Sequence, residues 1–248
     1  MIETTLGGLT LASALAAVAV VALAGLIRGI TGFGGAMVMA PPLALLLGPR
    51  LAVPITLMLE AFAAAPMLPA ASRIAQWRVL APIALAATAS VPLGVHLLAV
   101  SDAVTLRRAI AAVVVVFALL MLLGLRYRGP HRLWTSIGLG GLSGAMTGAT
   151  SISAPPVILY LLAGPDPVAL SRATLTLYIV VISVVGLALL ALRGLIDARA
   201  LWLAAAMTPP YVIGLLVGTR QFSRFSDRRF RQFTIAFMLA SAIVVLIA

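Results

Sequence analysis

The chain has 248 residues, of which 63% are hydrophobic and 9% are charged, and its formal net charge is +11 at pH 7. A globular domain has about 25% charged residues, so this composition excludes a soluble protein and predicts a polytopic membrane protein. The absence of cysteine excludes disulfides and thiolate metal sites. We expect no metal and no cofactor. We also expect no nucleic acid partner, because the basic residues lie in short loops where positive charge orients membrane helices.

Apolar runs separated by charges or by Gly and Pro predict ten helical segments, five in each half of the chain. They cover residues 9–27, 35–48, 51–71, 79–100 and 108–125, and then 133–147, 152–164, 168–192, 200–219 and 232–248. A spanning helix needs about 20 residues, and the second segment of each half is too short. We therefore predict an all-α fold with eight full spans plus two short segments. The N-terminus lacks the basic segment of a signal peptide, so the first run is expected to be a retained span.

The two halves carry a similar glycine-rich motif. Residues 25–42 read GLIRGITGFGGAMVMAPP and residues 140–156 read GGLSGAMTGATSISAPP, and each motif contains a Thr-Gly pair and ends in Pro-Pro. A repeated apolar segment interrupted by Gly and Pro indicates a transporter binding site. We predict two repeats in one membrane domain, residues 1–125 and 126–248, whose broken helices meet near the bilayer midplane.

The arginines predict the orientation of the two repeats. If all ten segments cross the membrane, most arginines fall on one face, and the other face receives only Arg50, Arg107, Arg108, Arg193 and Arg199. The positive-inside rule then places the 220–231 loop in the cytoplasm and both termini outside. An odd number of crossings in each half makes the repeats inverted. The alternative is that the short segments re-enter without crossing, which leaves the arginines more evenly divided.

These motifs resemble those of the sulfite exporter TauE/SafE family of membrane transporters. The resemblance rests on Gly25, Gly29, Gly32, Gly34 and Gly35 followed by proline, on Gly140, Gly144 and Gly148 followed by Pro155-Pro156, and on the stretch 171–174. Together with the length and the duplication it covers nearly the whole chain. It implies a carrier in the cytoplasmic membrane for sulfite or organosulfonates such as sulfoacetate and isethionate. The second motif departs from the family pattern at 149–153, where hydroxyls stand in place of an expected glycine.

A broken helix can bind an anion, because the next segment begins with free N–H groups and a partial positive charge. The predicted substrate site comprises Thr31, Gly32, Gly34, Gly35, Thr147, Gly148, Thr150, Ser151 and Ser153, with Arg28 and Arg172 as candidate cations. The alternatives are that the breaks only allow close packing, that Arg28 extends to the headgroups, and that Arg172 lies off the substrate path. For Gly25, Gly29, Gly140 and Gly144 we expect close helix packing.

Glu60 lies deep in an apolar run, where a charge costs about 3 kcal/mol. It must therefore be protonated, paired or in contact with a wet cavity. It is the candidate for proton coupling, and a shielded, purely structural acid is the alternative. The other expected partners are a small anionic substrate, the lipid bilayer and a second copy of the chain in a homodimer.

The sequence favours a secondary transporter that works by alternating access, and an anion-selective channel is the alternative. Broken helices also build pores, but the chain has no repeated ring of charged residues of the kind that lines many filters. The sequence argues against an intramembrane protease. Ser143 lies in a G-x-S-G motif, but both histidines, His96 and His131, precede it, and a protease of this type needs its base after the serine. An ATP-driven chain is excluded because a P-loop requires lysine and there is none.

Overall fold

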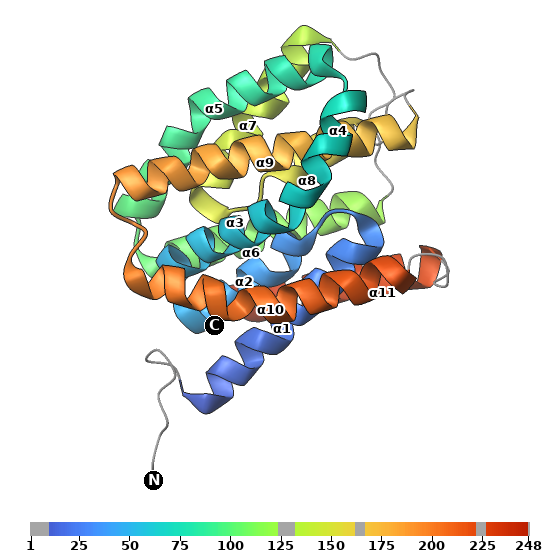
Figure 1. Cartoon of the computed structure of the whole chain (residues 1–248). Helices are drawn as coiled ribbons and strands as arrows, with labels where there is room; N and C mark the ends of the chain where they lie inside the picture. Colours follow the sequence, from blue (N-terminus) through green and yellow to red (C-terminus); the bar gives the residue numbers. More distant parts are fainter. Residues whose placement is uncertain (1–9, 124–131, 162–166, 222–226, 248) are drawn as a thin grey trace.

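The computed structural model describes residues 10–123, 132–161, 167–221 and 227–247, and throughout these ranges the only regular secondary structure is helical (Figure 1). The all-α prediction is thus confirmed for this part of the chain. The helices are α1 Leu11–Thr31, α2 Gly35–Leu47, α3 Pro49–Ala64, α4 Leu68–Ile74, α5 Trp77–Val100, α6 Ala103–Leu122, α7 Leu133–Thr150, α8 Ala154–Leu161, α9 Val168–Leu192, α10 Ala198–Gln221 and α11 Asp227–Ile247. A short 3₁₀ turn, Ala65–Met67, joins α3 to α4.

Local sequence signals explain several helix ends. The Thr10 hydroxyl accepts a hydrogen bond from the Ser13 N–H at 3.3 Å and begins α1 as its N-cap. Asp102 begins α6 in the same way, since its carboxylate accepts from the N–H groups of Val104 and Thr105. Pro49 occupies the first turn of α3, where its missing N–H costs no helix hydrogen bond.

Six helical stretches of the described residues are long and apolar enough to span a bilayer. They are α1, the continuous run Pro49–Ile74, α5, α6, α9 and α10. These confirm six of the eight expected full spans. The other two expected spans are not confirmed as full spans: α7 is rich in Gly, Ser and Thr, and the described apolar part of α11 is only Thr234–Ile247. The two expected short segments are confirmed as α2, with 13 residues, and α8, with 8.

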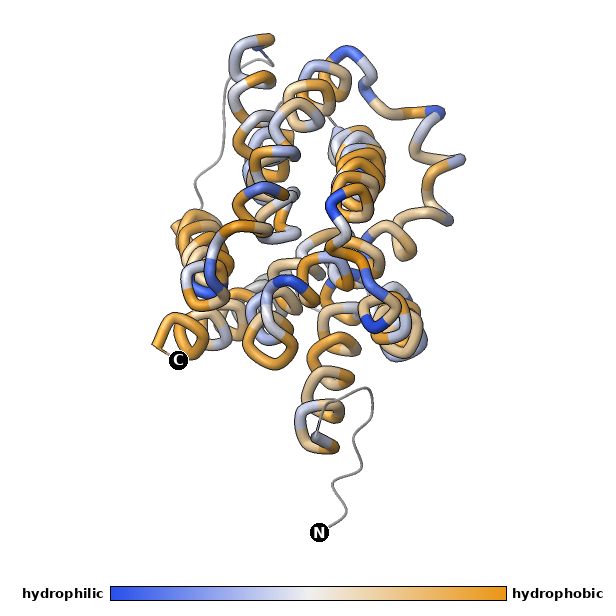
Figure 2. The backbone as a smooth tube through the Cα atoms, turned by 90° about the vertical axis from the view of Figure 1, so that its left-hand side faces the viewer, coloured by the Kyte–Doolittle hydropathy of each residue, from blue (hydrophilic) through white to orange (hydrophobic). Residues whose placement is uncertain are grey.

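The outer surface of the helices is apolar. Leu85, Leu123, Trp134 and Leu192 are among the large hydrophobic side chains that are mostly exposed. Figure 2 shows hydrophobic residues along most of the helices and only scattered hydrophilic ones. Soluble proteins rarely expose continuous apolar surface, so this exterior is suited to lipid.

Glycines allow two helix pairs to pack backbone against backbone. The most extensive contacts join α5 to α7 and α1 to α10. A Cβ atom at Gly25 or Gly29 would overlap the carbonyls of α10, and one at Gly140 or Gly144 would overlap those of α5. The prediction of close packing for these four glycines is therefore confirmed.

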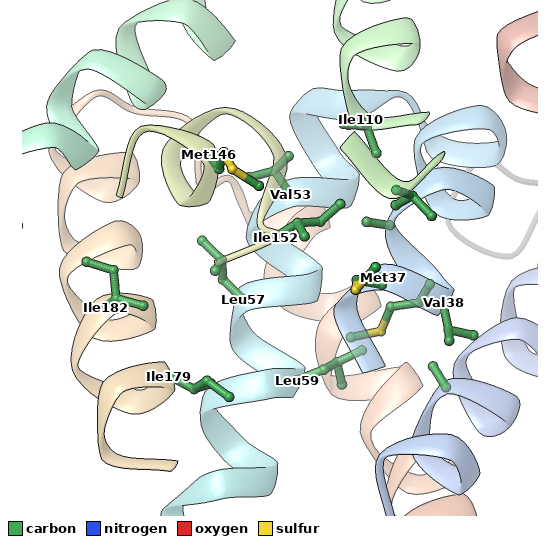
Figure 3. Packing of buried hydrophobic residues seen from close by; sticks show 14 of the residues in the cluster. Met37, Val38, Val53, Leu57, Leu59, Ile110, Met146, Ile152, Ile179 and Ile182 are labelled. Atoms are coloured by element: carbon green, nitrogen blue, oxygen red, sulfur yellow. The ribbon is translucent and has the colours of Figure 1, made fainter. Parts of the chain in front are cut away.

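Part of the core surrounds α3, which packs against α2, α7 and α9. Figure 3 shows Ile152, in the link between α7 and α8, beside Leu57 of α3, with Met37 of α2 and Ile179 of α9 nearby. All four side chains are buried. Short segments from both halves of the chain thus end inside the protein and not at the lipid surface.

The predicted 220–231 loop is shorter in the structure, because residues 220 and 221 belong to α10 and residues 227–231 belong to α11. Residues 222–226 lie outside the described residues. Arg28 and Arg172 lie within α1 and α9, so neither is a loop arginine. The orientation of the chain in the membrane therefore stays a prediction.

Candidate functional site

The first break separates α1 from α2. The chain leaves α1 after Thr31, and Gly32 and Gly34 take the left-handed conformation with φ of +82° and +86°. Glycine adopts this conformation without a steric penalty, which explains two glycines in so short a link. The Thr31 hydroxyl donates to the Ile27 carbonyl at 2.8 Å and accepts from the Phe33 N–H at 3.2 Å. The Gly32 N–H donates to the Arg28 carbonyl and completes the end of α1.

The second break, between α7 and α8, has the same local geometry. The Thr150 hydroxyl donates to the Met146 carbonyl at 2.7 Å and accepts from the Ile152 N–H at 3.3 Å. Ser151 follows with φ of +60°, and it is the one non-glycine residue with positive φ among those described. Its N–H donates to the Thr147 carbonyl. Thr150 and Ser151 therefore correspond to Thr31 and Gly32.

This correspondence corrects the expectation that Thr147-Gly148 is the counterpart of Thr31-Gly32. Thr147 lies inside α7, where its hydroxyl donates to the Ser143 carbonyl at 2.7 Å. Gly148 packs against α5, and a Cβ atom there would lie 2.5 Å from the Val91 carbonyl oxygen. A serine, and not a glycine, takes the left-handed position of the second break. Aligning the two motifs by their Thr-Gly pairs therefore matches Thr31 with Thr147, which lies three residues before its structural counterpart Thr150.

Both breaks line one buried cavity. The first contributes Gly34 and the first turn of α2, and the second contributes residues 151–155. Glu60 of α3 and Ile179 and Ser183 of α9 complete the lining. The cavity volume is about 10 Å³, close to the least that one water molecule needs. Of the predicted site residues, Gly34, Ser151, Ser153 and Glu60 therefore share this cavity.

Glu60 is paired and also lines the cavity. It forms a salt bridge with Arg28, and the Tyr211 hydroxyl donates to Glu60 Oε1 at 2.9 Å. Arg28 is 5% exposed and Glu60 is 4% exposed, so Arg28 does not extend to the headgroups. Gly35 lies directly against this group, which we call the acid cluster (Arg28, Glu60 and Tyr211). A buried ion pair is costly to desolvate, and a third partner such as Tyr211 helps to satisfy it.

Arg172 supports the first break from the other half of the chain. Its Nη2 donates to the Thr31 carbonyl at 3.4 Å. A cation at this position interacts favourably with the negative end of the α1 dipole. Arg172 is not among the cavity-lining residues.

Two buried hydrogen-bonded groups were missed by the sequence reasoning. Besides Tyr211, Tyr178 of α9 donates to Ser143 Oγ at 2.6 Å, and that hydroxyl in turn donates to the Ser153 carbonyl. Ser143, interpreted above only as a small residue without a catalytic base, therefore holds the second break. The available signal was a tyrosine in the middle of an apolar run, since a polar group at that depth needs a partner.

The two breaks differ in the donors that they offer. The first turn of α2 contains no proline, so its N–H groups are available as donors. In α8 the residues after Ala154 are Pro155 and Pro156, which have no N–H. The hydroxyls of Ser151 and Ser153 lie at this helix end beside the cavity, and that of Ser151 donates to the Thr150 carbonyl at 2.5 Å.

A family model described as sulfite exporter TauE/SafE matches residues 17–245. The match runs from α1 into α11 and includes both breaks, Arg28 and Glu60. No curated protein and no solved structure matches the chain.

Proposed function

The chain belongs to the sulfite exporter TauE/SafE family of membrane transporters, and from this premise we propose that it carries small sulfur-containing anions across the membrane by alternating access. Membership makes it a multi-pass protein of the cell membrane and a transporter, not an enzyme. The proposed substrates are sulfite and organosulfonates such as sulfoacetate and isethionate.

The observation that carries the proposal is the meeting of the two breaks at one buried cavity. The beginning of α2 offers N–H groups and the positive end of a helix dipole there, and Ser153 offers a hydroxyl. The Ser151 hydroxyl, which donates to the Thr150 carbonyl, turns from that carbonyl to reach the anion. The oxygens of a sulfonate or sulfite group accept several hydrogen bonds at once, so they match such a set of donors. The breaks are shaped around the anion by Thr31, Gly32, Gly35, Thr150 and Arg172. The packing of α7 is supported by Thr147 and Gly148.

The small cavity supports a carrier over a channel. A sulfonate is several times larger than a water molecule, and the cavity holds about one. The site must therefore widen before the anion enters. A transporter that alternates between closed and open forms has such a step, whereas an open pore does not need it.

Recurring contacts support the two-repeat arrangement, with residues 1–125 and 126–248 as inverted repeats and the breaks near the midplane. The hydroxyls of Thr31 and Thr150 make the same two hydrogen bonds. Gly29 lies against the Leu215 carbonyl of α10, and Gly148 lies in the same manner against the Val91 carbonyl of α5. Inverted repeats of this kind bind their substrate where the discontinuous helices meet.

The acid cluster supports a role for Glu60 in proton coupling. An anion in the cavity would lie beside the Glu60 carboxylate, and two negative charges at contact distance repel each other. Protonation of Glu60 would remove that repulsion and free the positive charge of Arg28 for the anion. A proton and an anion would then occupy the site together, and their movement across the membrane would be coupled.

Binding to the purified protein tests the proposed function. Sulfite, sulfoacetate, isethionate, taurine and sulfate are each added, and the shift in unfolding temperature is measured, because a ligand of the folded state raises that temperature. We expect stabilisation by at least one of the sulfur anions that the family transports, at concentrations where equal ionic strength of chloride has no effect. If none of the five stabilises the protein more than chloride, the proposed substrate class is wrong.

A further inference from the structure

Ser183 of α9 has a buried hydroxyl with no hydrogen-bond partner. The residue is 1% exposed, and its Oγ makes no hydrogen bond in the structure. Several hydroxyls on the spanning helices donate to the carbonyl one turn earlier, as Thr174 does to Leu170 and Thr208 does to Ala204. This is the usual arrangement for Ser and Thr in apolar helices, and Ser183 departs from it.

Ser183 lies on the face of α9 that lines the cavity. Ile179 and Ser183 lie one helical turn apart, and both line the cavity. The next turn of the same face brings Gly186 against Leu57 of α3 and Thr147 of α7. Figure 3 shows Ile179 extending from α9 towards α3. Ser183 thus belongs to the inner face of α9 and not to its lipid-facing side.

We propose that Ser183 donates a hydrogen bond to an oxygen of the bound sulfur oxyanion and contributes directly to its affinity. This inference rests on the proposed function, because it concerns the same cavity. The two breaks supply donors from α2 and from the link before α8, and Ser183 supplies one from α9. Donors from separate helices surround a three-oxygen group better than donors from one side. A hydroxyl that has no internal acceptor is free to turn towards the anion.

Thr56 of α3 provides a matched control. Its hydroxyl is also buried without a hydrogen-bond partner, at 0% exposure. Thr56 is not among the residues that line the cavity. Replacing it with the isosteric valine therefore removes an unpartnered hydroxyl without changing the proposed site.

The test measures anion affinity and thermal stability for the full-length wild-type protein, Ser183→Ala and Thr56→Val. Titration calorimetry with sulfoacetate and with sulfite gives the dissociation constants, and unfolding without anion gives the stability. We expect Ser183→Ala to weaken binding roughly 10-fold or more, the effect of losing one hydrogen bond to a charged group. Its unfolding temperature without anion should match or exceed that of the wild type, because the removed hydroxyl had no partner. Thr56→Val should bind as tightly as the wild type.

The outcomes separate this inference from the proposed function. Wild-type affinity in Ser183→Ala, while the wild type binds the anions, would overturn the role of Ser183 and leave the proposed function standing. Equal losses of affinity in Ser183→Ala and Thr56→Val would also overturn it, since the effect would then be general. If the wild type binds none of the five sulfur compounds named above, the proposed function itself has failed.

Discussion

Gly35 and Glu60 are in direct contact, and the absence of a side chain at position 35 makes that contact feasible. A Cβ atom on Gly35 would lie 2.5 Å from Glu60 Oε1 and 2.8 Å from the Tyr211 hydroxyl. The first residue of α2 therefore fits against the acid cluster only as glycine. This contact links the end of the first break to the ionisable group that lines the cavity.

Gly35→Ala should disturb the acid cluster. Overpacking a tight site costs about 1–3 kcal/mol, so we expect a lower unfolding temperature and weaker anion binding. Gly138→Ala is the control: position 138 is also inside a helix, α7, and nothing lies within 4 Å of a Cβ atom there. The control should be neutral or more stable by up to about 1 kcal/mol. Wild-type stability and affinity in Gly35→Ala would contradict the close fit.

Glu60→Gln should remove the pH dependence of anion flux but leave anion exchange intact. The amide keeps the shape of the side chain and cannot bind or release a proton. Flux into proteoliposomes, measured over a series of pH values on both sides, tests this. A Glu60→Gln protein that keeps the wild-type pH profile would reduce Glu60 to a structural acid.

Arg28→Met provides the complementary control for the ion pair, because it leaves the buried Glu60 carboxylate without its cation. Removing either partner of a buried pair costs about 3–5 kcal/mol, so Arg28→Met and Glu60→Gln should both unfold at a lower temperature than the wild type. Wild-type stability in both variants would mean that the pair contributes little to the folded state.

Thr31→Val and Thr150→Val should each destabilise a break, since both remove a hydroxyl that accepts an N–H just beyond a helix end. Losing one such hydrogen bond costs about 0.5–1.5 kcal/mol, which thermal unfolding can detect. Thr147→Val should cost less, because its hydroxyl only donates to a carbonyl that already belongs to α7. A larger loss for Thr147→Val than for Thr150→Val would restore the register read from the Thr-Gly pairs.

Cysteine labelling can test the orientation, since the chain has no native cysteine. Ser101, between α5 and α6, is predicted to face outside, and Ser226 lies in the 220–231 loop that is predicted to be cytoplasmic. An impermeant thiol reagent should modify Ser101→Cys in intact cells and Ser226→Cys only after lysis. The reverse pattern would invert the predicted orientation.

Asp102 should make α6 sensitive to acid. Hydrogen bonds from Thr105 and from the Val104 N–H hold the pKa of its carboxyl below the ordinary value. A lowered pKa in the folded state means that the carboxylate stabilises the fold above the unfolded pKa of about 4, and that this contribution is lost as the pH falls below it. Wild type and Asp102→Ala should thus differ in unfolding temperature near neutral pH and converge in acid. A constant difference would contradict the capping role.

Much of the fold could be predicted from the sequence because lipid imposes simple rules on length and polarity. Gly35 begins α2 and Gly48 follows its end, and Pro155 lies in the first turn of α8. The predicted starts of the two helices, at residues 35 and 152, lie within two residues of the observed starts, Gly35 and Ala154. The packing role of Gly25 and Gly144 also followed from their spacing. These features depend on local patterns, which a single sequence displays directly.

The remaining parts of the site depend on contacts between distant segments. Tyr211 reaches Glu60 from α10, and Arg172 reaches Thr31 from α9. Nothing in the local sequence of either residue specifies its partner. The left-handed conformation of Ser151 was equally hidden, because serine rarely adopts positive φ and glycine was the expected residue.

Helices of the two halves pack against each other, so the protein cannot be divided between α6 and α7 without exposing buried surface. The glycine face of α1 is covered by α10, and that of α7 is covered by α5, so each half buries its closest-packed surface only against the other. A fragment that ends after α6 would present bare backbone carbonyls of α5, and the Gly25 and Gly29 face of α1, to lipid. We therefore expect either fragment produced alone to be degraded or to pair with a second copy of itself, and the two produced together to reassemble.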